Sequence, residues 1–335
     1  MNRQHDKAAR RCDHIVITGA SSGIGQATAE AFARHGRRLV LAARDARALE
    51  DVAQSCRAAG AQVLTVPLDV ADGDAVRALA TTARDFCGTI DLWFSNVGVG
   101  AVGKFLNVPI EAHERTIRSN LIGHMNDAHA VLPIFIAQGR GVFVNMISLG
   151  GLASTPFSAA YGASKFGLRG FTEALRAELV EWPDVHICDV YPAFVDTPAL
   201  RHAGNYTGKV VTVPSIILDP RKVAAAVLDL AERPRPATYL GVPTWAARFG
   251  HWLAPSLTSR IANAAFELYF ARADTAAITA GNLFEPPEDG GGIDGGFRRS
   301  MSKPSKTAVV SATAGAAAIT AIGLFSKRQR NWPVA

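Results

Sequence analysis

The 335-residue sequence contains few cysteines, and none of them lies close to another in the sequence. Its four cysteines are scattered and form no C-x-x-C motif, so a disulfide scaffold is not expected and a reducing compartment is favoured. The histidines show no metal-ligand spacing either, and we expect no metal. With 48% hydrophobic and 19% charged residues, disorder as the main state is also excluded. The composition is that of an ordinary globular protein.

Most of the chain also lacks a net charge. The sequence contains 35 basic and 29 acidic residues, but seven of the basic residues and no acidic residue follow position 297. The remaining 28 basic and 29 acidic residues nearly cancel, which argues against a nucleic-acid surface. The N-terminal residues are polar, and the apolar run after them is too short for a secretory signal. We therefore expect a cytoplasmic protein.

From residue 14 to about residue 192, short apolar runs alternate with amphipathic stretches, as in βαβ units. The predicted strands are residues 14–18, 38–43, 62–66, 90–95, 141–147, 185–191 and 237–241. The predicted helices include residues 24–35, 47–59, 74–86, 158–180 and 220–232. Because βαβ crossovers are right-handed, this order predicts an α/β fold with a Rossmann-like, doubly wound parallel sheet.

Changes in composition divide the chain into five parts. Residues 1–12 form an N-terminal tail and residues 13–243 the single main domain. Residues 244–285 are rich in aromatic side chains and predict one or two helices on the substrate side. Residues 286–306 contain two successive prolines and a run of glycines, typical of a linker. Residues 307–335 form an apolar and basic C-terminal tail.

The first predicted strand leads directly into a glycine-rich turn, Gly19-Ala-Ser-Ser-Gly23-Ile-Gly25. Glycines here let the backbone turn tightly and approach a pyrophosphate, and the N-terminus of the next helix supplies free N–H groups. The spacing differs from the commoner G-x-G-x-x-G motif, and a glycine-rich run by itself can be no more than a tight turn. Its place after the first strand favours a dinucleotide-binding site.

The residue that closes the second predicted strand indicates which dinucleotide binds. An acidic residue there would bind the adenosine ribose and repel a 2′-phosphate, but this sequence has Ala43 followed by Arg44. A guanidinium suits a phosphate, which favours NADP(H) over NAD(H). Alternatively, Arg44 is a solvated helix-cap residue beside Asp45. Asp69, after the third strand, either contacts the adenine edge or caps the helix that begins near Asp72.

Ser148, Tyr161 and Lys165 suggest the chemical centre. Tyr161 and Lys165 are four residues apart in a predicted helix, so their side chains project from one face. A neighbouring ammonium and a cationic nicotinamide should both lower the phenol pKa, which would let Tyr161 exchange a proton with an alcohol or carbonyl oxygen. Ser148 follows a buried strand and would hold the same oxygen by a hydrogen bond, or else would cap the strand end.

Together these motifs resemble those of the short-chain dehydrogenase/reductase family over roughly residues 13–241. The segment Thr18-Gly-Ala-Ser-Ser-Gly-Ile-Gly25 is similar to the family's cofactor turn, and Tyr161-Gly-Ala-Ser-Lys165 to its active-site signature. The resemblance implies that Asn120 is a fourth catalytic residue, which holds Lys165 through a water, and that Lys165 also binds the nicotinamide ribose. The alternative for Asn120 is a kinked helix whose backbone groups it satisfies. The resemblance also implies a homo-oligomer packed through the helices containing Asn120 and Tyr161.

Two segments depart from the family pattern. Ser95-Asn-Val-Gly98 stands where the family commonly has Asn-Asn-Ala-Gly, so we retain Asn96 and Gly98 as cofactor contacts and not Ser95. Pro192-Ala-Phe-Val-Asp-Thr197 lacks the common Pro-Gly opening, which leaves Val195 and Thr197 as nicotinamide-side contacts. The expected cofactor-binding residues are Gly19, Ser21, Ser22, Gly23, Ile24, Gly25, Arg44, Asp69, Val70, Asn96, Gly98, Tyr161, Lys165, Val195 and Thr197.

The sequence thus predicts an NADP(H)-dependent oxidoreductase that moves a hydride between the nicotinamide and a secondary alcohol or carbonyl carbon. The irregular residues 194–215 and the aromatic stretch after Trp245 are expected to form the substrate pocket, and their apolar content favours a hydrophobic substrate. Two alternatives remain at this level: a non-catalytic NADP-binding regulator, and a membrane-tethered interaction protein.

The tethered alternative depends on residues 307–325, which carry no charge and are flanked by lysines and arginines. Their length is close to the roughly 20 apolar residues that span a bilayer. Seven of the 19 are alanine and three are threonine, however, which makes the segment only weakly hydrophobic. Membrane association, a soluble helix over the substrate mouth and disorder all stay open for this tail.

Overall fold

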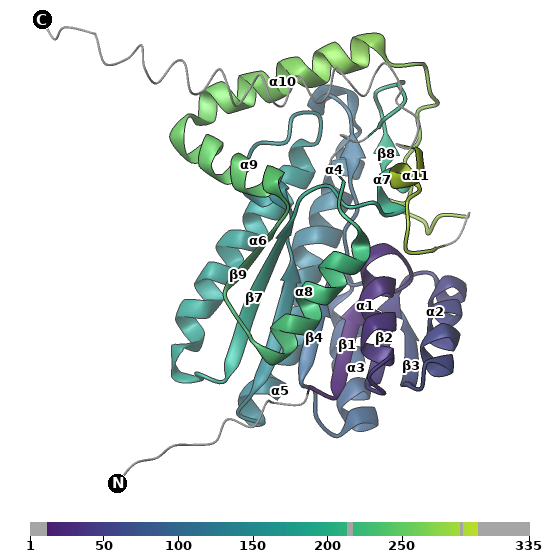
Figure 1. Ribbon diagram of the computed structural model, residues 1–335, viewed down its shortest axis with the longest axis vertical. Helices are drawn as coiled ribbons and strands as arrows, with labels where there is room; N and C mark the ends of the chain where they lie inside the picture. The colour runs from purple at the N-terminus through teal and green to yellow at the C-terminus, as the bar shows by residue number, and fades with distance from the viewer. Residues whose placement is uncertain (1–11, 213–216, 289–290, 301–335) are drawn as a thin grey trace, which may run out of the picture.

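The computed structural model describes residues 12–212, 217–288 and 291–300. Its centre is one seven-stranded parallel sheet with the strand order β3-β2-β1-β4-β6-β7-β9 (Figure 1). Chain order reverses direction between β1 and β4, which makes the sheet doubly wound and confirms the predicted Rossmann-like fold. The strands are β1 (His14–Thr18), β2 (Arg38–Ala43), β3 (Gln62–Pro67), β4 (Leu92–Ser95), β6 (Gly141–Met146), β7 (Val185–Pro192) and β9 (Ala237–Leu240).

Helices cover both faces of this sheet, which explains why most of its strand residues are apolar and not only alternate ones. In β1, Ile15 and Ile17 belong to a core with residues of α1, α2 and α8, whereas Val16 belongs to a second core with residues of α3 and α5. The covering helices are α1 (Gly23–Ala33), α2 (Ala46–Ala58), α3 (Gly73–Cys87), α5 (Gly123–Ala137), α6 (Ala159–Glu178) and α8 (Pro220–Glu232).

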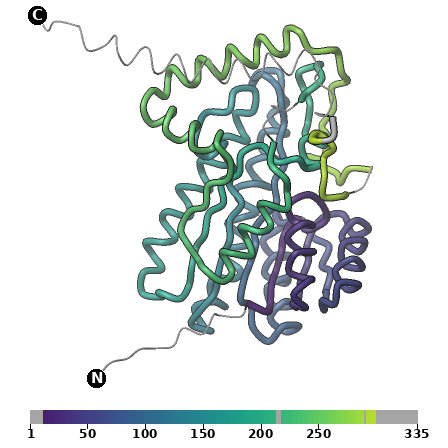
Figure 2. Tube along the Cα trace, viewed as in Figure 1, coloured from purple at the N-terminus to yellow at the C-terminus, as the bar shows by residue number. Residues whose placement is uncertain are grey.

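The irregular segment after β7 contains two short regular elements. These are α7 (Ala199–His202) and β8 (Gly204–Asn205), which pairs in parallel with β5 (Ala101–Val102). The aromatic stretch that follows β9 forms two helices, α9 (Val242–Leu253) and α10 (Pro255–Arg272), and Figure 2 shows them lying across one end of the molecule. Phe157, just before α6, packs against Phe266 and Phe270, which anchors α10 over that region.

The segment that the sequence presents as a linker is folded onto the main domain in the part that the structure describes. The Gly23 amide donates to the Gly292 carbonyl at 2.8 Å, and a short helix, α11 (Phe297–Ser300), ends the described chain. Glycine makes this packing feasible, since a Cβ at Gly291 would lie 2.4 Å from the Ser21 carbonyl oxygen and one at Gly295 would lie 2.5 Å from that of Thr197.

The apolar tail at residues 307–325 and nearly all of the N-terminal tail lie outside the described residues. Among the helices that are described, none has the length and apolar character needed to cross a membrane.

Candidate active site

The predicted site residues meet at one edge of the sheet, where the carboxyl ends of β1, β4, β6 and β7 lie together. The glycine turn follows β1, Asn96 follows β4, Ser148 follows β6 and Thr197 follows β7. This edge, at the point where the strand order reverses, is where ligands bind in open α/β sheets. The topology therefore brings together residues that are up to 178 positions apart in the chain.

The glycine turn has a backbone that only glycine adopts readily. Gly19 and Gly23 have φ values of +68° and +55°, in the left-handed region. Gly25 has no room for a side chain, because a Cβ there would lie 2.0 Å from the Gly19 carbonyl oxygen. Ser22 occupies the N-cap position of α1 without a capping side-chain hydrogen bond, so its side chain satisfies none of the N–H groups in the first turn of the helix.

Asn96 ties the end of β4 to the glycine turn. Its Nδ2 donates to the Gly19 carbonyl at 3.1 Å. The neighbouring Ser95 points the other way, into the core, where its hydroxyl donates to Asp127 at 2.6 Å. Thr18 donates to the same Asp127 oxygen at 2.8 Å, and burial raises the pKa of Asp127 to about 7. Asp127 was not singled out from the sequence; its only signal there is an acidic residue within an otherwise apolar helix.

Ser148 stands at the end of β6 with a strained backbone. Its φ of 150° is rare for a residue other than glycine, and such strain is concentrated at functional sites. The Ser148 hydroxyl accepts from the Gly150 amide at 3.2 Å, so it does cap the short helical turn that follows the strand. A hydrogen bond also links it to the Tyr161 hydroxyl and favours the phenolate. Capping and contact with Tyr161 are thus compatible.

In the protein alone, burial opposes the lowering of the Tyr161 pKa that is expected from Lys165 and a cationic nicotinamide. Burial raises the pKa of Tyr161, and only the Ser148 hydrogen bond opposes that rise. Burial also lowers the pKa of Lys165 to about 7, which weakens its charge near neutral pH. The Lys165 ammonium donates to the Met146 carbonyl at 2.9 Å and lies 5.8 Å from the centre of the Tyr161 ring. In the protein alone, desolvation therefore outweighs the expected charge effect.

Asn120 lies in a single π-helical turn, η2 (Arg118–Ile122), between α4 (Ile110–Ile117) and α5. Its side chain accepts from the Val99 amide and donates to the Val99 carbonyl, both at 2.8 Å, and donates to Ser164 at 3.2 Å. Asn120 thus satisfies backbone groups of the loop after β4, and not those of its own helix. Single π turns of this kind occur frequently at functional sites.

Arg44 is half-buried and does not cap α2. Asp45 caps α2 by accepting from the Ala48 amide, while the Arg44 guanidinium donates to three backbone carbonyls, those of residues 282–284. Burial and the nearby charge of Arg115 lower the pKa of Arg44. The guanidinium groups of Arg44 and Arg115 therefore lie close together beside the end of β2. Of the two, only Arg44 was predicted from the sequence.

Asp69 does not cap α3, because Asp72 does so by accepting from two amides of its first turn. Instead the Asp69 carboxylate accepts from the Ala71 amide and from the Arg115 guanidinium. Arg115 is a residue that sequence reasoning missed, since nothing in its local pattern distinguishes it from a solvated helix residue. Arg115 is thus a neighbour of both Asp69 and Arg44.

The remaining predicted cofactor contacts differ in burial and in the space beside them. Val70 and Val195 are buried, with 3% and 8% of their surfaces exposed, so they offer backbone more than side chain to a ligand. A Cβ at Gly98 would have nothing within 4 Å, which leaves open space beside it. The Thr197 side chain faces the glycine turn, 3.1 Å from where a Cβ of Gly23 would be.

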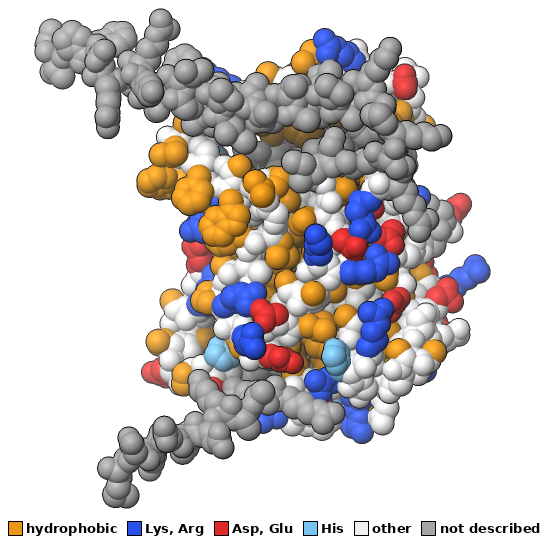
Figure 3. Space-filling model, in the orientation of Figure 1, with side chains coloured by type: hydrophobic (Ala, Val, Ile, Leu, Met, Phe, Trp, Pro, Cys, Tyr) orange, Lys and Arg blue, Asp and Glu red, His pale blue; other side chains and the backbone are white. Residues whose placement is uncertain are grey.

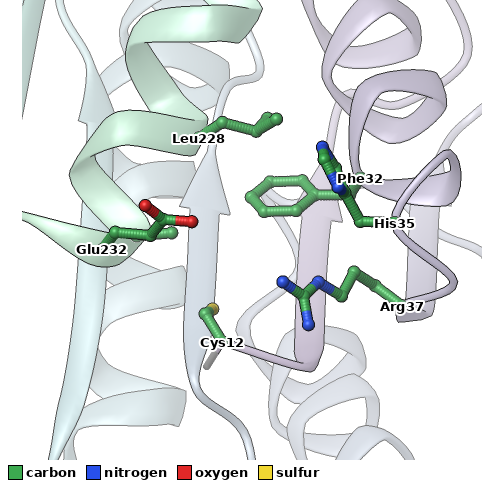
Figure 4. Close-up of a pocket in the computed structure, with 7 residues that line it drawn as sticks. Cys12, Phe32, His35, Arg37, Leu228 and Glu232 are labelled. Carbon is green, nitrogen blue, oxygen red and sulfur yellow. The ribbon is translucent and has the colours of Figure 1, made fainter. Parts of the chain in front are cut away.

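A small pocket at the opposite edge of the sheet is distinct from this site. Figure 4 shows it between α1 and α8, lined by Cys12, Phe32, His35, Arg37, Leu228 and Glu232 among others. It lies at the amino ends of β1 and β2, away from the edge where ligands of such sheets bind. In the described ranges there is also no group of three or more His, Cys, Asp or Glu that could hold a metal ion.

Comparison with known proteins gives consistent similarities. The family model described as short chain dehydrogenase matches residues 13–206. The uncharacterized oxidoreductase YxnA of Bacillus subtilis (strain 168) is 34% identical over 250 residues, which are 74% of this chain and 70% of YxnA. The ketoacyl reductase HetN of Nostoc sp. is 32% identical over 216 residues, 64% of this chain and 73% of HetN.

A similar solved structure is that of an alcohol dehydrogenase from the archaeon Thermococcus sibiricus, complexed with 5-hydroxy-NADP. The two chains are 27% identical with a TM-score of 0.58, over 68% of this chain and 95% of the other.

Proposed function

The chain belongs to the short-chain dehydrogenase family and is an oxidoreductase of that family; from this premise we propose that it uses NADP(H) to interconvert a hydrophobic secondary alcohol and its carbonyl compound. The observation that carries the proposal is the arrangement of Ser148, Tyr161 and Lys165 at the carboxyl edge of the sheet. All three lie beside the strand reversal, with Tyr161 hydrogen bonded to Ser148 and the Lys165 ammonium 5.8 Å from the Tyr161 ring.

The residues present fit a dinucleotide. The turn from Gly19 to Gly25 leaves no room for side chains at its closest approach, and α1 begins inside it, so backbone N–H groups rather than side chains would meet the phosphates. Among the described residues, the Lys165 ammonium donates to one acceptor, the Met146 carbonyl, which leaves further N–H donors for ribose hydroxyls. Asn96 would keep the turn in place through its bond to Gly19.

In the proposed reaction, the bound nicotinamide supplies or accepts the hydride. Tyr161 donates its hydroxyl proton to the carbonyl oxygen during reduction and takes it back during oxidation. Ser148 holds the same oxygen by a hydrogen bond and so fixes its distance from Tyr161. Lys165 holds the ribose and returns a proton toward Tyr161, and Asn120 fixes the loop after β4 against α6 through Val99 and Ser164.

The preference for NADP(H) rests on Arg44 and Arg115. Both guanidinium groups lie at the end of β2, where an acidic residue would repel a 2′-phosphate. Within the described residues, the hydrogen bonds of Arg44 go to neutral carbonyl groups, and a phosphate would give it stronger, charge-assisted hydrogen bonds. The 5-hydroxy-NADP in the similar alcohol dehydrogenase structure agrees with this preference.

The preference for a hydrophobic substrate rests on the aromatic side chains near Tyr161. Phe157 precedes α6 by two residues and packs on Phe266 and Phe270 of α10 with ring centres 5.8 and 4.9 Å apart. These rings lie on the side of the site formed by the C-terminal helices. An apolar wall beside a few convergent polar groups is typical of sites for apolar ligands.

We also infer a homo-oligomer packed through η2, α5 and α6. Their exposed faces carry Ile122, Met125 and Phe166, each with 38% of its surface exposed. Sedimentation velocity of the full chain tests this, since substitution of Phe166 by Glu should then shift an oligomer toward monomer.

The proposed activity is tested by NADPH and NADH oxidation across ketones and aldehydes of graded chain length. Faster turnover with NADPH than with NADH, rising with the apolar length of the substrate, is expected. Turnover with NADH alone contradicts the cofactor assignment. Turnover that falls as the substrate becomes longer contradicts the substrate assignment.

A further inference from the structure

The proposed cofactor cleft has two walls, and one segment of the chain touches both. One wall is the glycine turn with Arg44 beside it, and the other is the loop after β7 that contains Asp196 and Thr197. The segment consists of residues 281–288 and 291–298, and we call it the C-terminal strap. In Figure 1 it is the yellow-green and yellow chain beside α1, α7 and α11.

At the first wall, the strap occupies the donors of Arg44. The Arg44 guanidinium donates to the carbonyls of Asn282, Leu283 and Phe284 at 2.6, 3.1 and 3.0 Å. Arg115 donates to the Leu283 carbonyl as well, at 2.8 Å. Three successive peptide carbonyls thus lie where the proposed function needs the 2′-phosphate to bind.

The strap also occupies a donor of the glycine turn. The amide of Gly23, the first residue of α1, donates to the Gly292 carbonyl at 2.8 Å. Ser22 and Gly292 form an isolated parallel β-bridge, and Gly291 lies against Ser21, where a Cβ would be 2.4 Å from the carbonyl oxygen. A backbone oxygen of the strap therefore bonds to the helix terminus that would face a pyrophosphate.

At the second wall, the strap is bound through Asp196. The Gly295 amide donates to the Asp196 carbonyl at 3.0 Å, and the Phe297 amide donates to the Asp196 carboxylate at 2.9 Å. Asp196 is 1% exposed, so it is a fixed part of the wall and not a mobile surface side chain. Because the same strap bonds to Gly23 and Asp196, it bridges the cleft.

A cluster of ion pairs holds the end of the strap against the main domain. The Arg298 guanidinium pairs with Asp196, Asp219 and Asp294, and Arg221, in the first turn of α8, makes two bonds of 2.9 Å to Asp294. Arg298 contacts all three carboxylates, so it connects the end of the strap to the main domain at several points. Figure 3 shows basic and acidic side chains interleaved on this face of the molecule.

We propose that the C-terminal strap is a gate of the dinucleotide site, which must open at the Arg298 cluster before NADP(H) can bind. The inference rests on the proposed function, since it concerns the same cofactor. Its physical basis is competition for donors: Arg44 and the Gly23 amide bond to neutral carbonyls when the strap is closed, and phosphate oxygens form stronger bonds with both. The strap keeps these donors satisfied in the absence of nucleotide.

Backbone hydrogen exchange without nucleotide tests the gate directly. Arg298→Ala should speed exchange of the Gly23 and Gly295 amides at least tenfold, because it removes the bonds that hold the strap closed. Arg233→Ala, at the other end of α8, removes a long surface pair to Asp229 at 3.8 Å and is the matched control. Equal protection of both amides in wild type and Arg298→Ala overturns the proposal.

Nucleotide kinetics give a second readout. In stopped-flow measurements of NADPH fluorescence, Arg298→Ala should raise the association rate at least tenfold, and Arg233→Ala should leave it unchanged. An unchanged association rate in an Arg298→Ala variant that binds NADPH contradicts the gate and leaves the proposed function intact. If wild type and variant both fail to bind NADPH and NADH, the proposed function is contradicted, while hydrogen exchange still decides whether the strap opens.

Discussion

The Lys165 ammonium lies 5.8 Å from the centre of the Tyr161 ring and bonds to the Met146 carbonyl, so it faces the phenol without a direct hydrogen bond to its oxygen. Burial lowers the pKa of Lys165 to about 7 and raises that of Tyr161. In the protein alone, burial thus disfavours both the phenolate form of Tyr161 and the ammonium form of Lys165. An anionic ligand beside Lys165 would change this, because a negative charge favours the ammonium.

Replacement of Tyr161 by Phe should abolish turnover while leaving cofactor binding nearly unchanged. The phenol oxygen is the only group removed, and loss of a positioned acid or base costs roughly 10²–10⁴-fold in rate. Steady-state rates and NADPH titration on the same preparation measure the two effects. The control is Tyr269→Phe, which removes a phenol oxygen that bonds to Thr212 and Val210 and not to Ser148. Retained turnover in Tyr161→Phe would exclude Tyr161 as the acid.

Cofactor binding near pH 8 should take up a proton at Lys165. With a pKa of about 7 the side chain is mostly neutral at that pH, and the phosphates of a bound dinucleotide should raise its pKa so that it becomes charged. Calorimetry in buffers of different ionisation enthalpy measures this uptake, which should approach one proton per site. In Lys165→Met the uptake should vanish; if it persists, another group is responsible.

Replacement of Arg44 by Ala should weaken NADPH binding about 10- to 100-fold and leave NADH binding within a few-fold. Charge-assisted hydrogen bonds contribute about 1.5–3 kcal/mol, and only NADPH carries the 2′-phosphate. Arg47→Ala, an exposed position in the first turn of α2, is the matched control. An equal loss for both cofactors would mean that Arg44 acts through the strap and not through the phosphate, since Arg44 also bonds to residues 282–284.

The stability of the fold should fall as pH rises because of Asp127. Burial raises its pKa in the folded protein to about 7, above roughly 3.9 in the unfolded chain. Between these values the folded state binds more protons, so the free energy of unfolding decreases with pH, by on the order of 1–4 kcal/mol in total. Urea titrations from pH 4 to 8 measure this slope.

Asp127→Asn should remove that slope, because an amide does not titrate and its oxygen can still accept from Thr18 and Ser95. Asp51→Asn, at an exposed position in α2, serves as the control and should keep the wild-type slope. Identical slopes in wild type and Asp127→Asn would show that Asp127 is ionised throughout.

The sequence by itself determined the order of the strands and helices, the glycine turn and the positions of Ser148, Tyr161 and Lys165. These features depend on local periodicity and short spacings, which a linear pattern records. β1 and β2 agree with their predicted bounds, and α8 does so as well. Residues at the ends of β4, β6 and β7 could be placed together because parallel topology fixes which strand ends meet.

Only the tertiary structure decided what those residues contact. The bonds from Arg44 to residues 282–284 join positions about 240 apart, and no local pattern connects them. Arg115 enters the site through the fold, and the buried partner of Ser95, Asp127, is likewise set by a long-range contact. The low pKa of Lys165 likewise follows from how completely its neighbours exclude water, a property of packing in three dimensions. Spacing along the chain specifies which groups are available, whereas burial and long-range contacts set their charge and their partners.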